Sequence, residues 1–112
     1  MNLTNCFTVA IYHLNTRFKL PKSWGKYTLD INNMDYFVKY QRRFLAKKQH
    51  IDFFDSFCTQ VKKAKKDDVV LTPTSVGVAI NRFTYWVWSE DLGRVVHKQL
   101  NKECLIMRVD HG

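Results

Sequence analysis

With 112 residues, of which 46% are hydrophobic and 14% aromatic, the chain has the size and composition of one domain that builds a core without disulfides or metal. No apolar run approaches the roughly 18 residues of a membrane span, and the start lacks the basic segment and cleavage site of a secretory signal. Cys6, Cys58 and Cys104 are odd in number and widely spaced, so we expect free thiols in a reducing compartment.

The formal net charge of +8 is distributed unevenly. Residues 1–66 contain 13 Lys and Arg against 4 Asp and Glu, whereas residues 67–112 contain 5 against 6. The basic charge therefore belongs to the first part of the chain. We predict one domain over residues 1–112, with a helical half at 1–66 and a sheet half at 67–112.

Apolar residues in the first half recur at helical spacing. Phe7, Ile11 and Leu14 predict a helix over residues 4–15, which Thr4 or Asn5 can cap. A loop with Pro and Gly follows, and a second, amphipathic helix with a basic outer face is expected from about residue 34 to 48. Residues 51–57 form a further apolar patch of helical type, followed by the lysine-rich connector 62–66.

The second half is rich in β-branched and aromatic residues. The hairpin-forming segment 89–93 and a turn around Arg82 separate the predicted strands. Helices followed by antiparallel strands are typical of an α+β fold, here N-terminal helices packed on a small antiparallel sheet of about five strands. The predicted strands cover residues 69–72, 76–81, 84–88, 94–98 and 104–109.

Three stretches in this order resemble a known family. They are Asn5-Cys6-Phe7 at the first helix, Lys66-Asp67-Asp68-Val69-Val70-Leu71, and Ser75-Val76-Gly77-Val78-Ala79-Ile80. The chain resembles, over nearly its whole length, the papain-like fold of NlpC-type cell-wall peptidases, and in particular the short, diverged versions that bacteriophages encode near tail genes. The resemblance implies a papain-like fold and a phage setting.

The same resemblance assigns a place to each catalytic group. It implies that Cys6 stands where active members carry the nucleophile, and a helix N-terminus favours the thiolate that such a nucleophile requires. The base expected at the start of the third stretch is replaced by Ser75, and aromatic residues occupy the place of its orienting partner. His13 is about 10 Å along the helix from Cys6, which leaves His97 as the remaining candidate base.

Each of these residues also has a structural interpretation. Cys6 is better explained as a small buried hydrophobic residue at a helix start, and His97 as an ordinary strand histidine. No pair of histidines shows zinc-ligand spacing with a cysteine, so neither a metal site nor a cofactor is expected. Loss of the base favours a protein that has given up catalysis.

Two surfaces are candidates for interaction. The segment 83–88 is aromatic on both alternating faces, which is typical of a strand that is covered on both sides or meets another subunit. The basic helix can contact phosphates weakly or dock on an acidic partner. The predicted interface residues are Tyr85, Trp86, Trp88, Arg42, Arg43 and Lys47.

We therefore expect a catalytically degenerate papain-like domain that is a structural or docking component of a phage virion, in the tail or neck and assembled in the host cytoplasm. Its expected partners are other virion proteins, with a homo-oligomeric ring as one arrangement. One alternative is an active cysteine hydrolase of peptidoglycan amide bonds that uses Cys6. Another is a basic protein that binds nucleic acid or inhibits a host enzyme.

Overall fold

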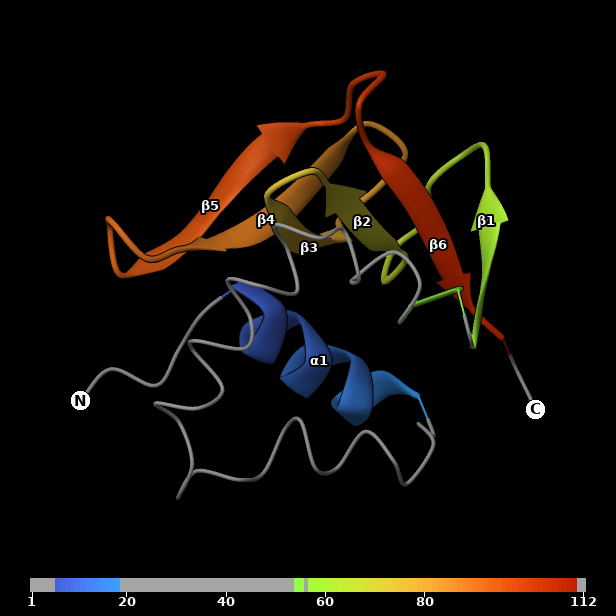
Figure 1. Cartoon of the computed structure of the whole chain (residues 1–112), viewed down its shortest axis with the longest axis horizontal. Coiled ribbons are helices and arrows are strands. Elements are labelled where there is room, and N and C mark those ends of the chain that lie inside the picture. The colour runs from blue at the N-terminus through green and yellow to red at the C-terminus, as the bar shows by residue number, and fades with distance from the viewer. Residues whose placement is uncertain (1–5, 19–53, 56, 111–112) are drawn as a thin grey trace.

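The fold is taken from a computed structural model, which describes residues 6–18, 54–55 and 57–110. Within these residues one helix, α1, lies across one side of an arched sheet of six strands (Figure 1). The helix α1 spans Cys6–Arg17. The strands are β1 (Cys58–Val61), β2 (Val69–Thr72), β3 (Ser75–Ala79), β4 (Thr84–Ser89), β5 (Arg94–Gln99) and β6 (Leu105–Val109).

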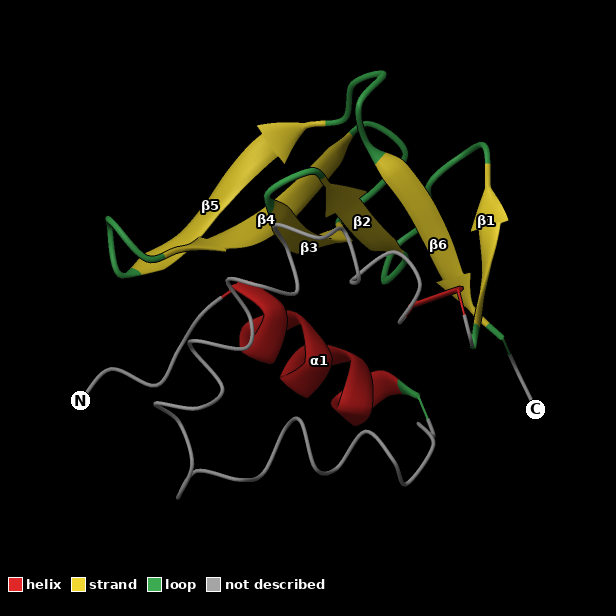
Figure 2. Ribbon diagram, viewed as in Figure 1, coloured by secondary structure: helices red, strands yellow, loops and turns green. Residues whose placement is uncertain are grey.

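All neighbouring strands of the sheet are antiparallel, in the order β1-β6-β2-β3-β4-β5. Short turns join β2 to β5 as a meander, and the chain then returns so that β6 lies between β1 and β2 (Figure 2). The β4–β5 hairpin closes through Gly93, whose φ of +62° is a left-handed conformation that favours glycine. Among the residues that the structure describes, β1 and β5 are therefore the two edges of the sheet.

The main core lies between α1 and the sheet. The helix buries one stripe of apolar side chains, including Phe7, Ile11 and Leu14, because residues three to four apart share a helix face. These pack against the sheet residues that alternation turns toward the helix, such as Leu71 and Val78. This packing fixes α1 over β3 and β4.

A second, smaller core lies on the opposite face of the sheet. Val70, Ala79, Tyr85 and Val87 are buried there, and residues such as Val96 pack around them. The strand β4 is therefore covered on both faces, since Trp86 packs against the main core, and this is one of the two arrangements that its aromatic pattern favours.

Gly77 allows β3 and β4 to lie close together. A Cβ atom at this position would be 2.5 Å from the backbone oxygen of Trp86 and 2.8 Å from the ring of Tyr85. The absence of a side chain at Gly77 thus leaves the space that the Tyr85 ring and the β4 backbone occupy beside β3.

The α+β class and the antiparallel sheet were predicted correctly from the sequence. The first helix and all five predicted strands are present, with ends that differ by up to two residues. The prediction missed β1, which lies in the half assigned to helices, so the described residues form a sheet of six strands. The second predicted helix lies outside the described residues.

Candidate functional site

Cys6 is the first residue of α1, and its side chain is only 8% exposed. Burial raises the pKa of the thiol above its ordinary value of 9.0, and the negative charge of Glu90 adds to this rise. Hydrogen bonds with the backbone of Val76 and of the helix start lower the pKa, but less than burial raises it. The thiol is therefore protonated at neutral pH, and the helix N-terminus does not make it a ready nucleophile.

Ser75 occupies the position where the resemblance places a base. Its hydroxyl oxygen is 2.6 Å from the hydroxyl oxygen of Thr72, at the hairpin that joins β2 to β3. A serine hydroxyl is not a proton acceptor near neutral pH in the way that an imidazole is. The groups that set the pKa of Cys6 among the described residues include no histidine.

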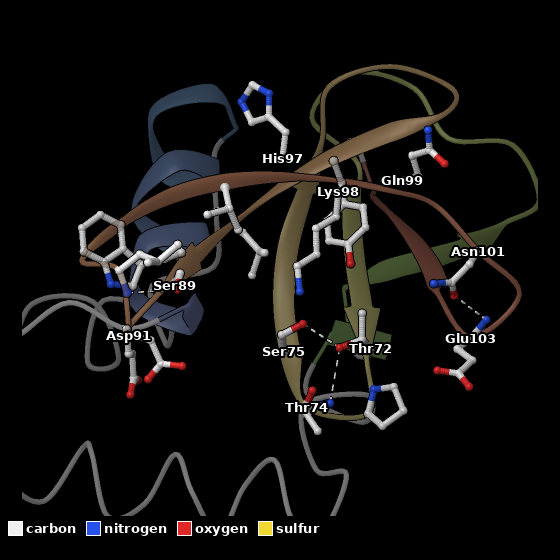
Figure 3. A pocket seen from close by; sticks show the side chains of 17 residues that line it. Thr72, Thr74, Ser75, Ser89, Asp91, His97, Lys98, Gln99, Asn101 and Glu103 are labelled. Carbon is white, nitrogen blue, oxygen red and sulfur yellow. Dashed lines mark hydrogen bonds between the residues drawn. The ribbon is translucent and has the colours of Figure 1, made fainter.

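The two described histidines hold other positions. His97 lies on the edge strand β5 opposite Trp86, with an exposed side chain, and it is among the residues that line the groove described below (Figure 3). His13 lies two turns along α1, where its Nε2 is 2.7 Å from Asp67 Oδ1 and its ring meets Trp86 edge-on at 5.2 Å. The structure thus gives His13 a structural contact that the sequence did not indicate.

The predicted interface residues on β4 are largely covered. Tyr85 is 4% exposed, and burial, with a smaller contribution from Cys104, raises the pKa of its phenol. Trp86 and Trp88 are partly buried, against the main core and the second core respectively. The Nε1–H of Trp88 is a buried donor without an acceptor in the described part of the chain. Arg42, Arg43 and Lys47 lie outside the described residues.

A groove of about 940 Å³ lies on the face of the sheet opposite α1. The hairpin between β2 and β3 forms one wall, and β4, β5 and the residues after β5 form the rest (Figure 3). Tyr85, Val87 and Val96 supply apolar surface, while Ser75 and Lys98 supply polar groups. The groove can therefore hold an extended peptide segment that makes both apolar and polar contacts.

Two consecutive acidic residues before β2 connect separate elements of the fold. Asp68, which is buried, accepts hydrogen bonds from Arg108 Nε at 3.0 Å and Nη2 at 2.8 Å, and from the backbone N–H of Lys65 at 2.8 Å. Asp67 holds His13. The Asp-Asp pair was visible in the sequence, but its partners on α1 and β6 are brought to it only by the fold.

Within the described ranges, no three His, Cys, Asp or Glu side chains are grouped so that they could hold a metal ion. In the same residues, no helix has the length and apolar character that crossing a membrane demands. Comparison with protein-family models, curated proteins and solved structures finds no match. The relation to NlpC-type peptidases therefore stays a prediction from the sequence.

Proposed function

We propose that the chain is a catalytically inactive docking domain of papain-like descent, which serves as a structural component of a bacteriophage virion in the tail or neck. The state of Cys6 carries the proposal. Its thiol is buried, its pKa is raised, and the residue at the expected position of the base is Ser75. A cysteine hydrolase needs a thiolate and an imidazole that takes the proton.

The papain-like part of the proposal is supported by one contact between distant parts of the chain. The first residue of α1 interacts with the backbone of Val76, at the start of β3. The resemblance expects the nucleophile and the start of this strand to be neighbours. A helix on an antiparallel sheet is also compatible with such a fold. The phage setting rests on the resemblance alone.

The loss of catalysis is tested by the reactivity of the three thiols. The intact protein is treated with iodoacetamide at pH 7.5, and labelling of each cysteine is followed by mass spectrometry. We expect Cys6 to react at least about tenfold more slowly than it does in a synthetic peptide of residues 1–12. Selective, rapid labelling of Cys6 that is lost in His97→Ala would instead support the hydrolase.

A matched activity assay completes this test. Digestion of purified peptidoglycan by the wild type and by Cys6→Ala should give identical products at background level. Release of peptides by the wild type that Cys6→Ala abolishes would contradict the proposal. Ser75→His serves as a further control variant, because it places an imidazole at the start of β3, where the resemblance expects the base.

The virion role is tested on the particles themselves. Particles of the phage that encodes the chain are purified by density gradient, and their proteins are identified by mass spectrometry. The proposal expects the chain in the particles at a fixed ratio to the other tail or neck proteins. Abundant chain in the infected-cell lysate but none in the particles would contradict it.

A further inference from the structure

The strand β5 is an open edge of the sheet. Its six residues pair with β4 in one continuous register, from Arg94 opposite Ser89 to Gln99 opposite Thr84. Within the described residues, no strand pairs with its outer side, and all its side chains are exposed except the half-buried Val96. An open edge strand presents backbone donors and acceptors to any extended chain that approaches it.

The hairpin geometry identifies which backbone groups face outward. The N–H of Leu100 donates to the oxygen of Phe83, and the N–H of Gly93 donates to the oxygen of Ser89 at the other end. Hydrogen-bonded and non-bonded residue pairs alternate along an antiparallel ladder. Counting from either end, the β5 residues that bond to β4 are Arg94, Val96 and Lys98. The N–H and C=O groups of Val95, His97 and Gln99 therefore face away from β4.

The side chains of the other three β5 residues, Arg94, Val96 and Lys98, share one face of the strand, and Val96 and Lys98 line the groove. Val96 is opposite Val87, and Lys98 is opposite Tyr85, so both share the face that carries the second core. Figure 3 shows Lys98 reaching into the groove on the side of Ser75. Among the described residues, neither Lys98 nor Arg94 takes part in an ion pair. An apolar position thus lies between two unpaired cations on one face.

We propose that β5 binds an extended segment of a partner protein as an additional strand, with an acidic side chain, an apolar side chain and a second acidic side chain at alternate positions. These three side chains lie opposite Arg94, Val96 and Lys98, because residues two apart share one face of a strand. The inference rests on the proposed docking function and names the surface and the class of partner for it.

The charge of β5 decides between a foreign segment and a second copy of this chain. The strand contains Arg94 and Lys98 and no acidic residue. An antiparallel pair of two β5 strands centred on Val96 would bring Arg94 of each copy opposite Lys98 of the other, and directly opposed like charges destabilise a sheet. An acidic segment forms cross-strand pairs of opposite charge at the same two places.

The probe is a fluorescein-labelled peptide, Thr-Glu-Thr-Val-Thr-Glu-Thr, and its binding to the whole chain is measured by fluorescence anisotropy. The control peptide carries Lys in place of both Glu. We expect the acidic peptide to bind at least about tenfold more tightly than the control, and Lys98→Glu to remove this preference, because each peptide then faces one like and one opposite charge. Equal binding of both peptides, or none, overturns the inference.

A pair of variants at one position tests the backbone contact. His97→Pro removes an N–H that faces outward and leaves the ladder to β4 intact, and proline is tolerated at such edge positions. His97→Thr keeps this donor. Peptide binding should weaken at least about tenfold in His97→Pro and less than about twofold in His97→Thr. Equal effects of the two variants would contradict strand addition.

Hydrogen exchange of the wild type makes the test independent of how the variants fold. In the free chain the amides of Val95, His97 and Gln99 should exchange rapidly, and saturation with the acidic peptide should slow them at least about tenfold. Unchanged exchange under saturation overturns the inference. Such a result leaves the proposed function standing, since that function is judged by thiol reactivity, peptidoglycan digestion and particle composition.

Discussion

His13 and Asp67 join the helix to the sheet across 54 positions of the sequence, with Nε2 and Oδ1 2.7 Å apart. A carboxylate only accepts hydrogen bonds, so the His13 Nε2–H is the donor. Asp67 has a φ of +72°, a conformation that Asp tolerates better than most residues. The His13 ring also meets Trp86 edge-on, so one side chain connects α1 with the turn before β2 and with β4.

We expect the His13–Asp67 pair to contribute to stability in a double-mutant cycle. His13→Ala and Asp67→Ala should each lower the free energy of unfolding, and the coupling between them should be about 1 kcal/mol, because both side chains are mostly buried. Urea denaturation of the four proteins measures the coupling. Thr16→Ala combined with Asp67→Ala is the control cycle, since the exposed Thr16 hydroxyl donates only to the His13 carbonyl. A His13–Asp67 coupling no larger than the coupling in this control cycle would contradict the assignment.

The neighbouring Asp68 makes a stronger contact. Its carboxylate is buried and receives two N–H groups of Arg108, a geometry that a lysine does not reproduce. Arg108→Lys should lower the free energy of unfolding by roughly 1 kcal/mol, and Asp68→Ala by roughly 2 to 3 kcal/mol, because it also leaves the Lys65 N–H without its acceptor. Chemical denaturation measures both, and an Asp68→Ala variant as stable as the wild type would refute the account.

Gly77 and Gly93 are needed for different reasons, Gly77 for the lack of space around it and Gly93 for its backbone conformation. Gly77→Ala places a Cβ 2.5 Å from a backbone oxygen of β4, so β3 and β4 must move apart, at a cost of roughly 2 to 3 kcal/mol. Gly93→Ala meets no atom within 4 Å, but it strains a φ of +62°, at a cost of about 1 kcal/mol. Thermal unfolding compares the two variants, and an equal or reversed order would contradict this distinction.

The sequence predicted β2 to β6 because their β-branched and aromatic residues favour strands locally. It did not predict β1, where Cys58-Thr59-Gln60-Val61 follows an apolar patch of helical type. That segment becomes a strand through its pairing with β6, in which Cys58 lies opposite Val109. Pairing with a strand about 50 residues away cannot be predicted from the local sequence pattern.

The candidate site was predictable to a similar extent. The position of Cys6 at a helix start follows from the spacing of Phe7, Ile11 and Leu14. The burial of its thiol does not, because it depends on packing with distant residues such as Val70 and Ala79, which only the fold brings to the helix start. The groove beside Lys98 likewise forms only when the β2–β3 hairpin and β5 are brought together.

Cys58 makes the stability of the chain sensitive to alkaline pH. Burial is the main cause that raises the pKa of its thiol from 9.0 to about 12, and the charges of Asp110, Asp68 and Asp55 add to it. A raised pKa means that the folded state holds its proton more tightly than the unfolded state. The resulting stability is fully present below pH 9 and is lost as the pH rises toward 12.

The free energy of unfolding should therefore fall between pH 8 and pH 10.5, with roughly 2 kcal/mol of the decrease due to Cys58. Cys58→Ala should reduce the decrease by that amount even though it is less stable at pH 8, because the titrating group is gone. Cys104→Ala, which alters a half-buried thiol, is the control for the general effect of alkali on lysines and tyrosines. Urea denaturation at the two pH values measures all three proteins, and equal decreases in the wild type and Cys58→Ala would show that the Cys58 thiol is not linked to folding.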